Sequence, residues 1–436
     1  MTEGKKFGYT EEEFRRFRRG AWSFLLFFSL LYCTFYSARV NLSNAGALLI
    51  EQLGLSKAQL GILTSTLFWT YGIGQLINGR LSDRLGPERF IVWGVTASVA
   101  LNFLVALQRS FPLMVVLWGL NGFAQSMAWA PGIAIITRWW PRRERGFATG
   151  FAYAFTGFGQ VAAILTVSLS LRATPVLGWR AVFLIPPLFP LAALGVYLAL
   201  ARSSPRRIGL PDFEEENASA REKEGEMLAM AGEKGVLWPY RYVLSETHFL
   251  TWIIIIFLVG IIRYGLSTWA PLYFVEKYGI NIKSGLLSSL TLPLGMAVGT
   301  ITVPWLTDRF CPDNRLRAVV FSALTLPLIM LAMTRLDPTV PWQMACVQLL
   351  LFFSGFGIYA ISGVSNTYAT DVGGRVFAGT ASGILSFSAY MGAAIQSLLY
   401  GFLLDTLGWN FIFLSVAVLC LAVAAVSIRD LRRHRQ

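Results

Sequence analysis

Near its beginning the chain contains the stretch Ser29-Leu-Leu-Tyr-Cys-Thr-Phe-Tyr-Ser-Ala-Arg-Val-Asn-Leu-Ser43, inside an apolar run from about Ala21 to Ile50 whose only charge is Arg39. A run of this length crosses a bilayer whose hydrocarbon core is about 30 Å thick. An arginine near the middle of such a helix costs roughly 2.5–3.5 kcal/mol on insertion scales. The stretch therefore predicts a membrane span whose central cation contacts a polar cavity or a partner.

Two tyrosines accompany this arginine. Tyr32 and Tyr36 precede Arg39 by seven and three residues, so in a helix all three side chains share one face. A guanidinium flanked by two phenols is suited to bind an anion, because it presents a planar fork of donors and never loses its proton. Arg39 could instead pack within the bundle and pair with backbone carbonyls. The sequence leaves both interpretations open.

The composition extends this prediction to the whole chain. Of the 436 residues, 55% are hydrophobic and only 14% charged, with a mean hydropathy of +0.56, which excludes a set of soluble domains. We predict an all-α polytopic membrane protein. Twelve transmembrane helices are expected at about 21–49, 57–79, 89–108, 111–137, 145–170, 178–200, 247–275, 283–306, 316–334, 341–368, 376–400 and 406–428.

The net charge of +13 is distributed by membrane side rather than as a nucleic-acid-binding patch. Of the 37 Lys and Arg residues, 28 lie in the two tails and in the predicted connections on the same side. Seven lie on the opposite side, and Arg39 and Arg263 lie inside spans. Because cytoplasmic loops are rich in Lys and Arg, we expect both termini in the cytoplasm and a multi-pass protein of the cytoplasmic (inner) membrane. No nucleic-acid partner is expected.

The sequence contains no residue pattern that indicates an enzyme or a metal site. The four cysteines and two histidines have no zinc-binding or redox spacing. The interior of the predicted spans contains no carboxylate or histidine that could serve as an intramembrane acid, base or proton relay, since His248 lies at the edge of its span. We therefore expect no metal, no cofactor and no enzyme activity, and the missing carboxylates weigh against proton symport.

One long polar stretch, Arg202–Thr247, divides the predicted spans six plus six. The expected domains are a cytoplasmic tail at 1–20, a six-helix bundle at 21–200, a cytoplasmic linker able to hold one amphipathic helix at 201–246, a second six-helix bundle at 247–428 and a cytoplasmic tail at 429–436.

The two halves also resemble each other. Leu81-Ser-Asp-Arg84 after the second span matches Leu306-Thr-Asp-Arg309 after the eighth, at an offset of 225 residues. The same offset carries Arg39 to within one residue of Arg263, the only charge in the interior of the seventh span. Arginines at equivalent positions of two repeats should face each other across a pseudo-twofold axis, where secondary transporters bind their substrates.

The segment Gly79-Arg-Leu-Ser-Asp-Arg-Leu-Gly-Pro-Glu-Arg89 has the spacing Gly-x-Leu-x-Asp-Arg-x-Gly. It resembles the loop between helices two and three of the major facilitator superfamily, although a plain solvated loop is an alternative. Asp83 can cap a neighbouring helix or pair with a basic loop, where Arg145 is the candidate partner. Such a contact would hold the cytoplasmic side shut. The predicted gating residues are Asp83, Arg84, Arg145, Asp308 and Arg309.

A narrower resemblance comes from the interior residues. The chain combines the tyrosines and arginine of its first span with Phe123-Ala-Gln-Ser-Met-Ala-Trp-Ala-Pro131, Trp139-Trp-Pro-Arg-Arg-Glu-Arg-Gly146, Arg263-Tyr-Gly-Leu-Ser-Thr-Trp-Ala-Pro-Leu-Tyr273 and Gly355-Phe-Gly-Ile-Tyr359. In this it is similar to the organophosphate:phosphate antiporters, which exchange glycerol phosphate or sugar phosphates for inorganic phosphate. The similarity covers nearly the whole chain except the tails and the linker.

This resemblance implies a substrate site. It assigns Arg39 and Arg263 to the phosphoryl group, and it implies cavity-lining roles for Tyr32, Tyr36, Tyr71, Trp129, Tyr359 and Tyr390. Any one of these aromatic side chains could instead serve only helix packing. Members of the family carry a lysine on helix two and a histidine on helix five near the phosphate, where this chain has Gln75 and Thr156. The site thus has less positive charge, which keeps a smaller phosphorus anion, a phosphonate, a carboxylate or a sulfonate open as substrate.

The predicted function is that of a secondary active transporter, a monomer that moves a small organic anion across the lipid bilayer by alternating access. Exchange for phosphate or another counter-anion is the expected mode. Two alternatives remain: an anion symporter of the same superfamily, and a transporter-like receptor that senses an organic anion.

Overall fold

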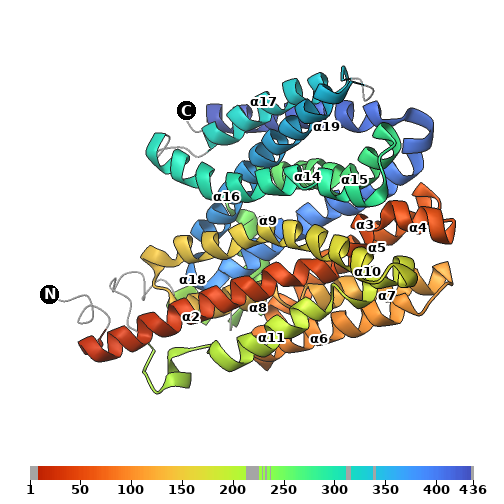
Figure 1. Ribbon diagram of the computed structural model, residues 1–436. Helices are drawn as coiled ribbons and strands as arrows, with labels where there is room; N and C mark the ends of the chain where they lie inside the picture. Colours follow the sequence, from red (N-terminus) through yellow and green to blue (C-terminus); the bar gives the residue numbers. More distant parts are fainter. Residues whose placement is uncertain are drawn as a thin grey trace.

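The computed structural model describes residues 8–212, 225–227, 229–230, 233–235, 237–310, 316–336 and 340–433. Within these residues every regular element is a helix, which confirms the all-α fold. Figure 1 shows the helices as a bundle, with the two chain ends marked on the same side of it. We call this the termini side, and the side where α3, α4 and α15 lie the far side.

The first half of the chain forms a series of long helices joined by short ones. In chain order its elements are α2 (Glu11–Phe35), η1 (Tyr36–Ala38), α3 (Asn41–Asn44), α4 (Gly46–Leu53), α5 (Lys57–Leu85), α6 (Pro87–Ala106), α7 (Phe111–Gln125), α8 (Trp129–Trp139), α9 (Arg142–Ala173), η2 (Pro175–Arg180), α10 (Ala181–Leu184) and α11 (Leu188–Leu200).

The second half follows the polar stretch. The polar stretch itself contains η3 (Pro205–Ile208) and α13 (Trp238–Ser245), and the elements after it are α14 (Phe249–Tyr278), α15 (Ile282–Ser288), α16 (Thr291–Phe310), α17 (Leu316–Met333), α18 (Pro341–Leu407) and α19 (Trp409–Arg433). In the predicted linker, α13 is a helix of eight residues that packs against α18, because the rings of Trp238 and Tyr242 contact that of Phe377.

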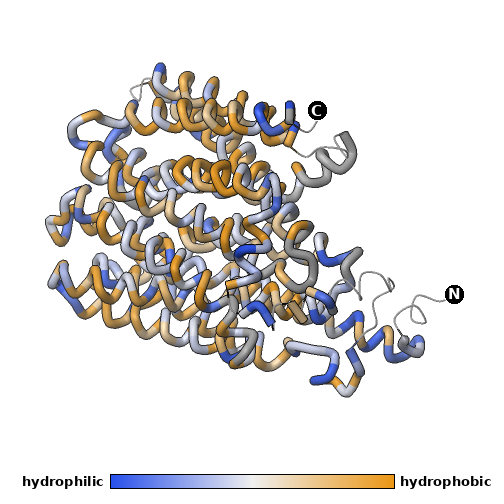
Figure 2. The backbone as a smooth tube through the Cα atoms, turned by 180° about the vertical axis from the view of Figure 1, so that it is seen from behind, coloured by the Kyte–Doolittle hydropathy of each residue, from blue (hydrophilic) through white to orange (hydrophobic). Residues whose placement is uncertain are grey.

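The periphery of the bundle is apolar, as expected of a multi-pass membrane protein. Among the described residues, eleven helices are long and apolar enough to cross a membrane. The predicted eighth span, 283–306, is not among them and corresponds to α15 and α16. Large apolar side chains are exposed around the bundle, including Val116, Phe321, Leu328 and Val418 at 57–71%. Figure 2 shows hydrophobic residues along the helix bodies and hydrophilic ones at the start of α2.

Two predicted spans, 341–368 and 376–400, lie in one helical run, α18. A straight helix of its 67 residues would be about 100 Å long, roughly three times the thickness of the hydrocarbon core. Two separate stretches of it, Trp342–Ser365 and Thr380–Leu407, have the length and hydropathy of a span. Helical structure continues between these two spans. Residues 366–379, which connect them, contain no proline that would interrupt a helix.

The prediction of one continuous helix through Arg39 is wrong. α2 ends at Phe35, a 3₁₀ turn covers Tyr36–Ala38, and helical structure resumes with α3 at Asn41. The carbonyl oxygen of Ala38 accepts hydrogen bonds from the amide nitrogens of Asn102 on α6 and Asn121 on α7, at 3.0 and 3.1 Å. These two side chains replace the hydrogen bond that the carbonyl of Ala38 would have received in a continuous helix. Inside a membrane a backbone carbonyl needs such a partner, because no water is present.

The fourth predicted span is also interrupted, between α7 and α8. Pro131 is the third residue of α8, and a proline has no amide hydrogen to donate to the carbonyl four residues earlier. The sixth predicted span, 178–200, is divided in the same way at Pro186 and Pro187, which lie between α10 and α11. Prolines thus account for the interruptions of the fourth and sixth spans.

Candidate functional site

Arg39 lies directly after the 3₁₀ turn, and only 2% of its surface is exposed. Its guanidinium carbon is 4.0 Å from the ring centre of Tyr36, 5.0 Å from that of Tyr71 and 5.6 Å from that of Tyr32. Nη1 of Arg39 donates a hydrogen bond of 3.1 Å to the hydroxyl of Tyr390 on α18. The two tyrosines predicted beside Arg39 do contact it, and aromatic faces surround the cation.

Arg263 lies in the middle of α14 and is 9% exposed. Its guanidinium carbon is 4.6 Å from the ring centre of Tyr359 and 4.9 Å from that of Tyr264. The hydroxyl of Tyr359 in turn accepts a hydrogen bond of 3.0 Å from Nε2 of Gln160 on α9. Both arginines are therefore buried among tyrosines, and contacts from both halves of the chain hold the aromatic cluster together.

A cavity of about 70 Å³ lies among these side chains. We call it the aromatic cavity, and it contains most of the residues predicted to bind substrate. The predicted residues that line it are Arg263, Tyr32, Tyr36, Tyr71, Gln75, Trp129, Thr156 and Tyr390.

The other two predicted residues adjoin the aromatic cavity without lining it. Tyr359 packs under Arg263, and Arg39 lines a second, smaller cavity toward the far side. Tyr153 and Tyr264, which were not predicted, also line the aromatic cavity. Tyr264 directly follows Arg263 in the sequence, so its position beside a membrane-embedded arginine was a usable signal.

Several hydrogen-bond donors of the site have no partner among the described residues. They are Nε and Nη2 of Arg39, Nε of Arg263 and Nε2 of Gln75. Neither arginine forms an ion pair within the described part of the chain. A buried donor without a partner costs roughly 1–3 kcal/mol, and a charged one more. The arrangement therefore favours a bound group that brings negative charge and acceptor oxygens.

The two positions that depart from the family are neutral and differ in what they offer. The hydroxyl of Thr156 donates to the carbonyl of Tyr153 at 2.7 Å, so its oxygen can still accept a hydrogen bond from a ligand. Gln75 is 2% exposed, and its amide nitrogen is free to donate. In the described structure the positive charge of the site therefore comes from Arg39 and Arg263.

Of the predicted gating residues, the structure describes the side chain of Arg145. The side chains of Asp83, Arg84, Asp308 and Arg309 fall outside what the structure describes. Arg145 is buried in the first turn of α9, and its neighbour Glu144 forms an ion pair with Arg18 of α2. The predicted contact between Asp83 and Arg145 stays a prediction.

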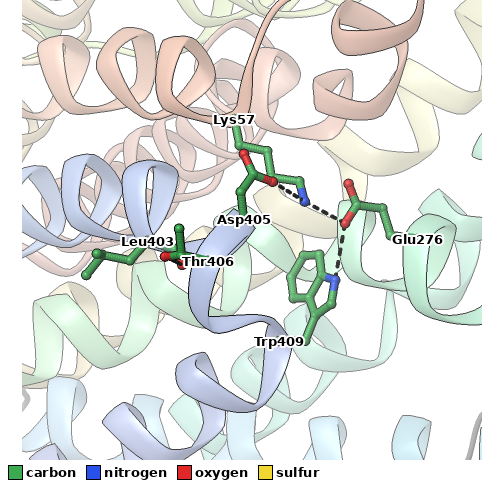
Figure 3. A network of polar contacts seen from close by, with 6 residues as sticks. All are labelled: Lys57, Glu276, Leu403, Asp405, Thr406 and Trp409. Atoms are coloured by element: carbon green, nitrogen blue, oxygen red, sulfur yellow. Dashed lines mark hydrogen bonds and ion pairs between the residues drawn. The ribbon is translucent and has the colours of Figure 1, made fainter.

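An ionic network on the far side was not predicted. Nζ of Lys57, the first residue of α5, lies 2.9 Å from Oε2 of Glu276 on α14 and 2.9 Å from Oδ1 of Asp405 on α18 (Figure 3). Nε1 of Trp409 donates to the same Glu276 oxygen at 3.2 Å. Lys57 thus joins the first half of the chain to the second. These three charges lie at the ends of predicted spans, on the side of the membrane that has few Lys and Arg residues. That shared position was the signal that could have indicated the network.

Close backbone packing lies next to this network. A Cβ atom on Gly61 of α5 would lie 2.5 Å from the carbonyl oxygen of Ser397 and 3.1 Å from Cα of Gly401, both on α18. Only a glycine allows this approach, which is common where small residues bring membrane helices together. The two halves are therefore in tight contact at the far side.

Comparison with known proteins identifies the family. A profile of the Major Facilitator Superfamily matches residues 27–397. The chain is 31% identical to a probable hexose phosphate transport protein of Chlamydia trachomatis, over 95% of this chain and 93% of that protein. It is 28% identical to the glycerol-3-phosphate transporter of Bacillus subtilis, over 89% and 87% of the two chains.

The fold comparison agrees. The crystal structure of a bacterial homolog of the human lysosomal transporter Spinster, inward-facing and unoccupied, matches with a TM-score of 0.72 at 16% identity, over 93% of this chain and 96% of that one. These similar proteins are transporters, which confirms the prediction that the chain is not an enzyme. The chain belongs to the major facilitator superfamily and, within it, to the organophosphate:phosphate antiporter family.

Proposed function

We propose that this protein is a secondary active transporter of a small organic anion, an organophosphate or a close analogue, in the cytoplasmic membrane. The observation that carries the proposal is the pair of buried arginines, Arg39 and Arg263, which have no ion-pair partner among the described residues. Similarity to hexose phosphate and glycerol-3-phosphate transporters supports the substrate class.

Obligate exchange with phosphate follows from the same charges. Without an anion the two guanidinium groups repel each other, and no ion pair among the described residues offsets the desolvation cost of their burial. A bound dianion neutralises both, so the loaded carrier can rearrange more easily than the empty one. Each reorientation then requires an anion on the carrier. This favours exchange over net uptake and needs no proton relay.

Alternating access requires contacts that hold one side shut at a time. For the far side we assign this role to the ion pairs of Lys57 with Glu276 and Asp405, together with the glycine contact beside them. For the termini side we keep Asp83 and Arg145 as the proposed closing pair, with both termini in the cytoplasm. Asp83→Asn should then slow exchange with little effect on equilibrium binding.

Counterflow into proteoliposomes tests the proposal. Purified protein, reconstituted as a monomer, is loaded with inorganic phosphate inside and offered labelled glycerol phosphate, hexose phosphate, a phosphonate and a sulfonate in turn. We expect uptake of at least one of these anions that depends on internal phosphate. Uptake that is the same with and without internal phosphate would rule out exchange, and binding without uptake would indicate a receptor.

A further inference from the structure

A second cavity, of about 20 Å³, lies beyond Arg39 toward the far side of the bundle. We call it the outer cavity. Asn44, Thr64 and Gln160 line it from the first half of the chain, and Thr268 and Ser289 from the second. Each of these five side chains is at most 5% exposed. Arg39 is the only charged side chain that lines it, and the uncharged hydroxyl and amide groups distinguish it from the tyrosine-lined aromatic cavity.

The hydrogen-bonding groups of the outer cavity complement an alcohol. Nδ2 of Asn44 is buried and has no hydrogen-bond partner among the described residues, so it can donate to a ligand. The hydroxyls of Thr64 and Ser289 already donate to the carbonyls of Leu60 and Leu286, at 2.8 and 2.7 Å. Their oxygens are therefore left to accept. A free donor beside such acceptors matches a hydroxyl group, which both accepts and donates.

The size and charge of the outer cavity indicate that it accepts a small uncharged group. Its volume of about 20 Å³ holds one to two water-sized groups at 10–15 Å³ each. A second anionic group would find one cation here, Arg39, one of whose nitrogens already donates to Tyr390. A single uncharged hydroxyl needs no cation to balance it.

We propose that the outer cavity is a subsite for a hydroxyl group of the transported organic anion, with Asn44 as its donor. This inference rests on the proposed function. The anionic end of the substrate occupies the aromatic cavity near Arg263, Arg39 contacts it from between the two cavities, and the hydroxyl reaches Asn44. The subsite would then distinguish a hydroxylated phosphate ester from inorganic phosphate and from an alkyl phosphate of the same length.

Competition measurements on Asn44→Leu test this assignment, because leucine has the same number and branching of side-chain heavy atoms as asparagine and no polar atoms. Unlabelled glycerol phosphate, propyl phosphate and inorganic phosphate compete with labelled phosphate in a phosphate self-exchange assay. We expect Asn44→Leu to weaken competition by glycerol phosphate roughly 3–10-fold, the effect of one hydrogen bond. Competition by propyl phosphate and by inorganic phosphate should change by less than about twofold, since neither makes this hydrogen bond.

Three further variants complete the test. Thr268→Val removes a hydroxyl on the opposite wall and should act in the same direction, which covers the case of an Asn44→Leu protein that does not fold. Asn44→Ser keeps a smaller donor and should recover part of the selectivity. Asn410→Leu is the matched control, since Asn410 is an exposed residue of α19.

An equal loss for all three competitors, or no loss for any, would overturn the subsite and leave the outer cavity as a site for water. Failure of the wild-type protein to exchange phosphate is a different result. It would count against the proposed exchange function itself, and with it the subsite. The two failures are thus distinguishable in one experiment.

Discussion

Arg39 of the first half and Tyr390 of the second are joined by a hydrogen bond of 3.1 Å from Nη1 to the phenolic oxygen. The ring of Tyr390 also lies 4.1 Å from that of Tyr71, which itself contacts the guanidinium of Arg39. The cation of one half is therefore oriented by a side chain of the other. An anion that binds Arg39 acts on a contact between the halves, which links binding to their relative position.

Tyr390→Phe should weaken substrate binding by roughly 3–10-fold, because one hydrogen bond that orients Arg39 is lost while the ring is kept. The measurement is KM for exchange together with the amount of folded protein. Tyr400→Phe is the control: Tyr400 lies on the same helix, and its hydroxyl bonds to Ser415 within the second half. Equal effects of the two substitutions would show that Tyr390 serves packing alone.

Arg39→Lys and Arg263→Lys should each reduce exchange by roughly 10–150-fold, the range for charged hydrogen bonds, because an ammonium cannot reproduce the planar fork of donors. Initial rates of counterflow, normalised to reconstituted protein, give the measurement. Arg180→Lys is the control, since Arg180 also lies over a ring, that of Trp179, but does not line the aromatic cavity. Near-normal affinity and rate in either site variant would refute the paired-arginine site.

Lys57→Met should favour opening of the far side. It removes two ion pairs that join the halves, each worth about 0.2–1 kcal/mol where partly exposed, so the open population should rise roughly 2–30-fold. The readout is the rate at which a membrane-impermeant thiol reagent labels Ser397→Cys in a cysteine-free background. Ser397 is fully buried next to Gly61 at this contact.

The control for this experiment is Lys277→Met, which removes an exposed cation next to Glu276 in the sequence. It should leave the labelling rate unchanged. If Lys57→Met also left it unchanged, the ion pairs would not hold the far side shut, and the glycine contact alone would have to account for closure.

Gln75→Lys should raise the affinity for dianionic phosphate esters relative to monoanions by ~1–3 kcal/mol, the scale of a charge-assisted hydrogen bond. It should also flatten the pH dependence of uptake between about 5.5 and 7.5, because the second phosphate proton dissociates with a pKa of about 6. A third cation favours the dianion where it is scarce. Competition uptake with a phosphate monoester and a monoanionic carboxylate measures the ratio.

The contrary result for Gln75→Lys is a selectivity ratio equal to that of the wild type. If transport of every substrate fell together, the lysine would be a buried charge without a partner, and Gln75 would serve packing. Thr156→Ser, which keeps the hydroxyl of the other neutral position, is the matched control and should leave the ratio unchanged.

The aromatic cluster could be anticipated from the sequence because its main signals are local. A charge inside an apolar span is visible by inspection, and Tyr32 and Tyr36 lie within two helical turns of Arg39. The position of Arg263 followed from the offset between the halves. The grouping of Tyr71, Trp129 and Tyr390 around one cavity, in contrast, rested on the family resemblance, since these residues are far apart in the chain.

The parts that were missed depend on tertiary contacts. The break at Tyr36–Ala38 contains no proline or glycine to mark it, and its carbonyl partners lie about 60 and 80 residues further along the chain. The three charges of the far-side network come from three separate helices, and no spacing rule connects them. The outer cavity is likewise formed by side chains of both halves.

The interruption of the first helix has a consequence for biosynthesis. Asn102 and Asn121, which donate to the carbonyl of Ala38, lie 64 and 83 residues after it in the chain and are therefore synthesised later than the first span. An unsatisfied carbonyl in lipid costs several kcal/mol, so the newly inserted segment is more stable as an uninterrupted helix. We therefore expect the first span to enter the membrane as a straight helix and to bend only when the third and fourth spans pack against it. The arginine site would then form after these spans have been inserted.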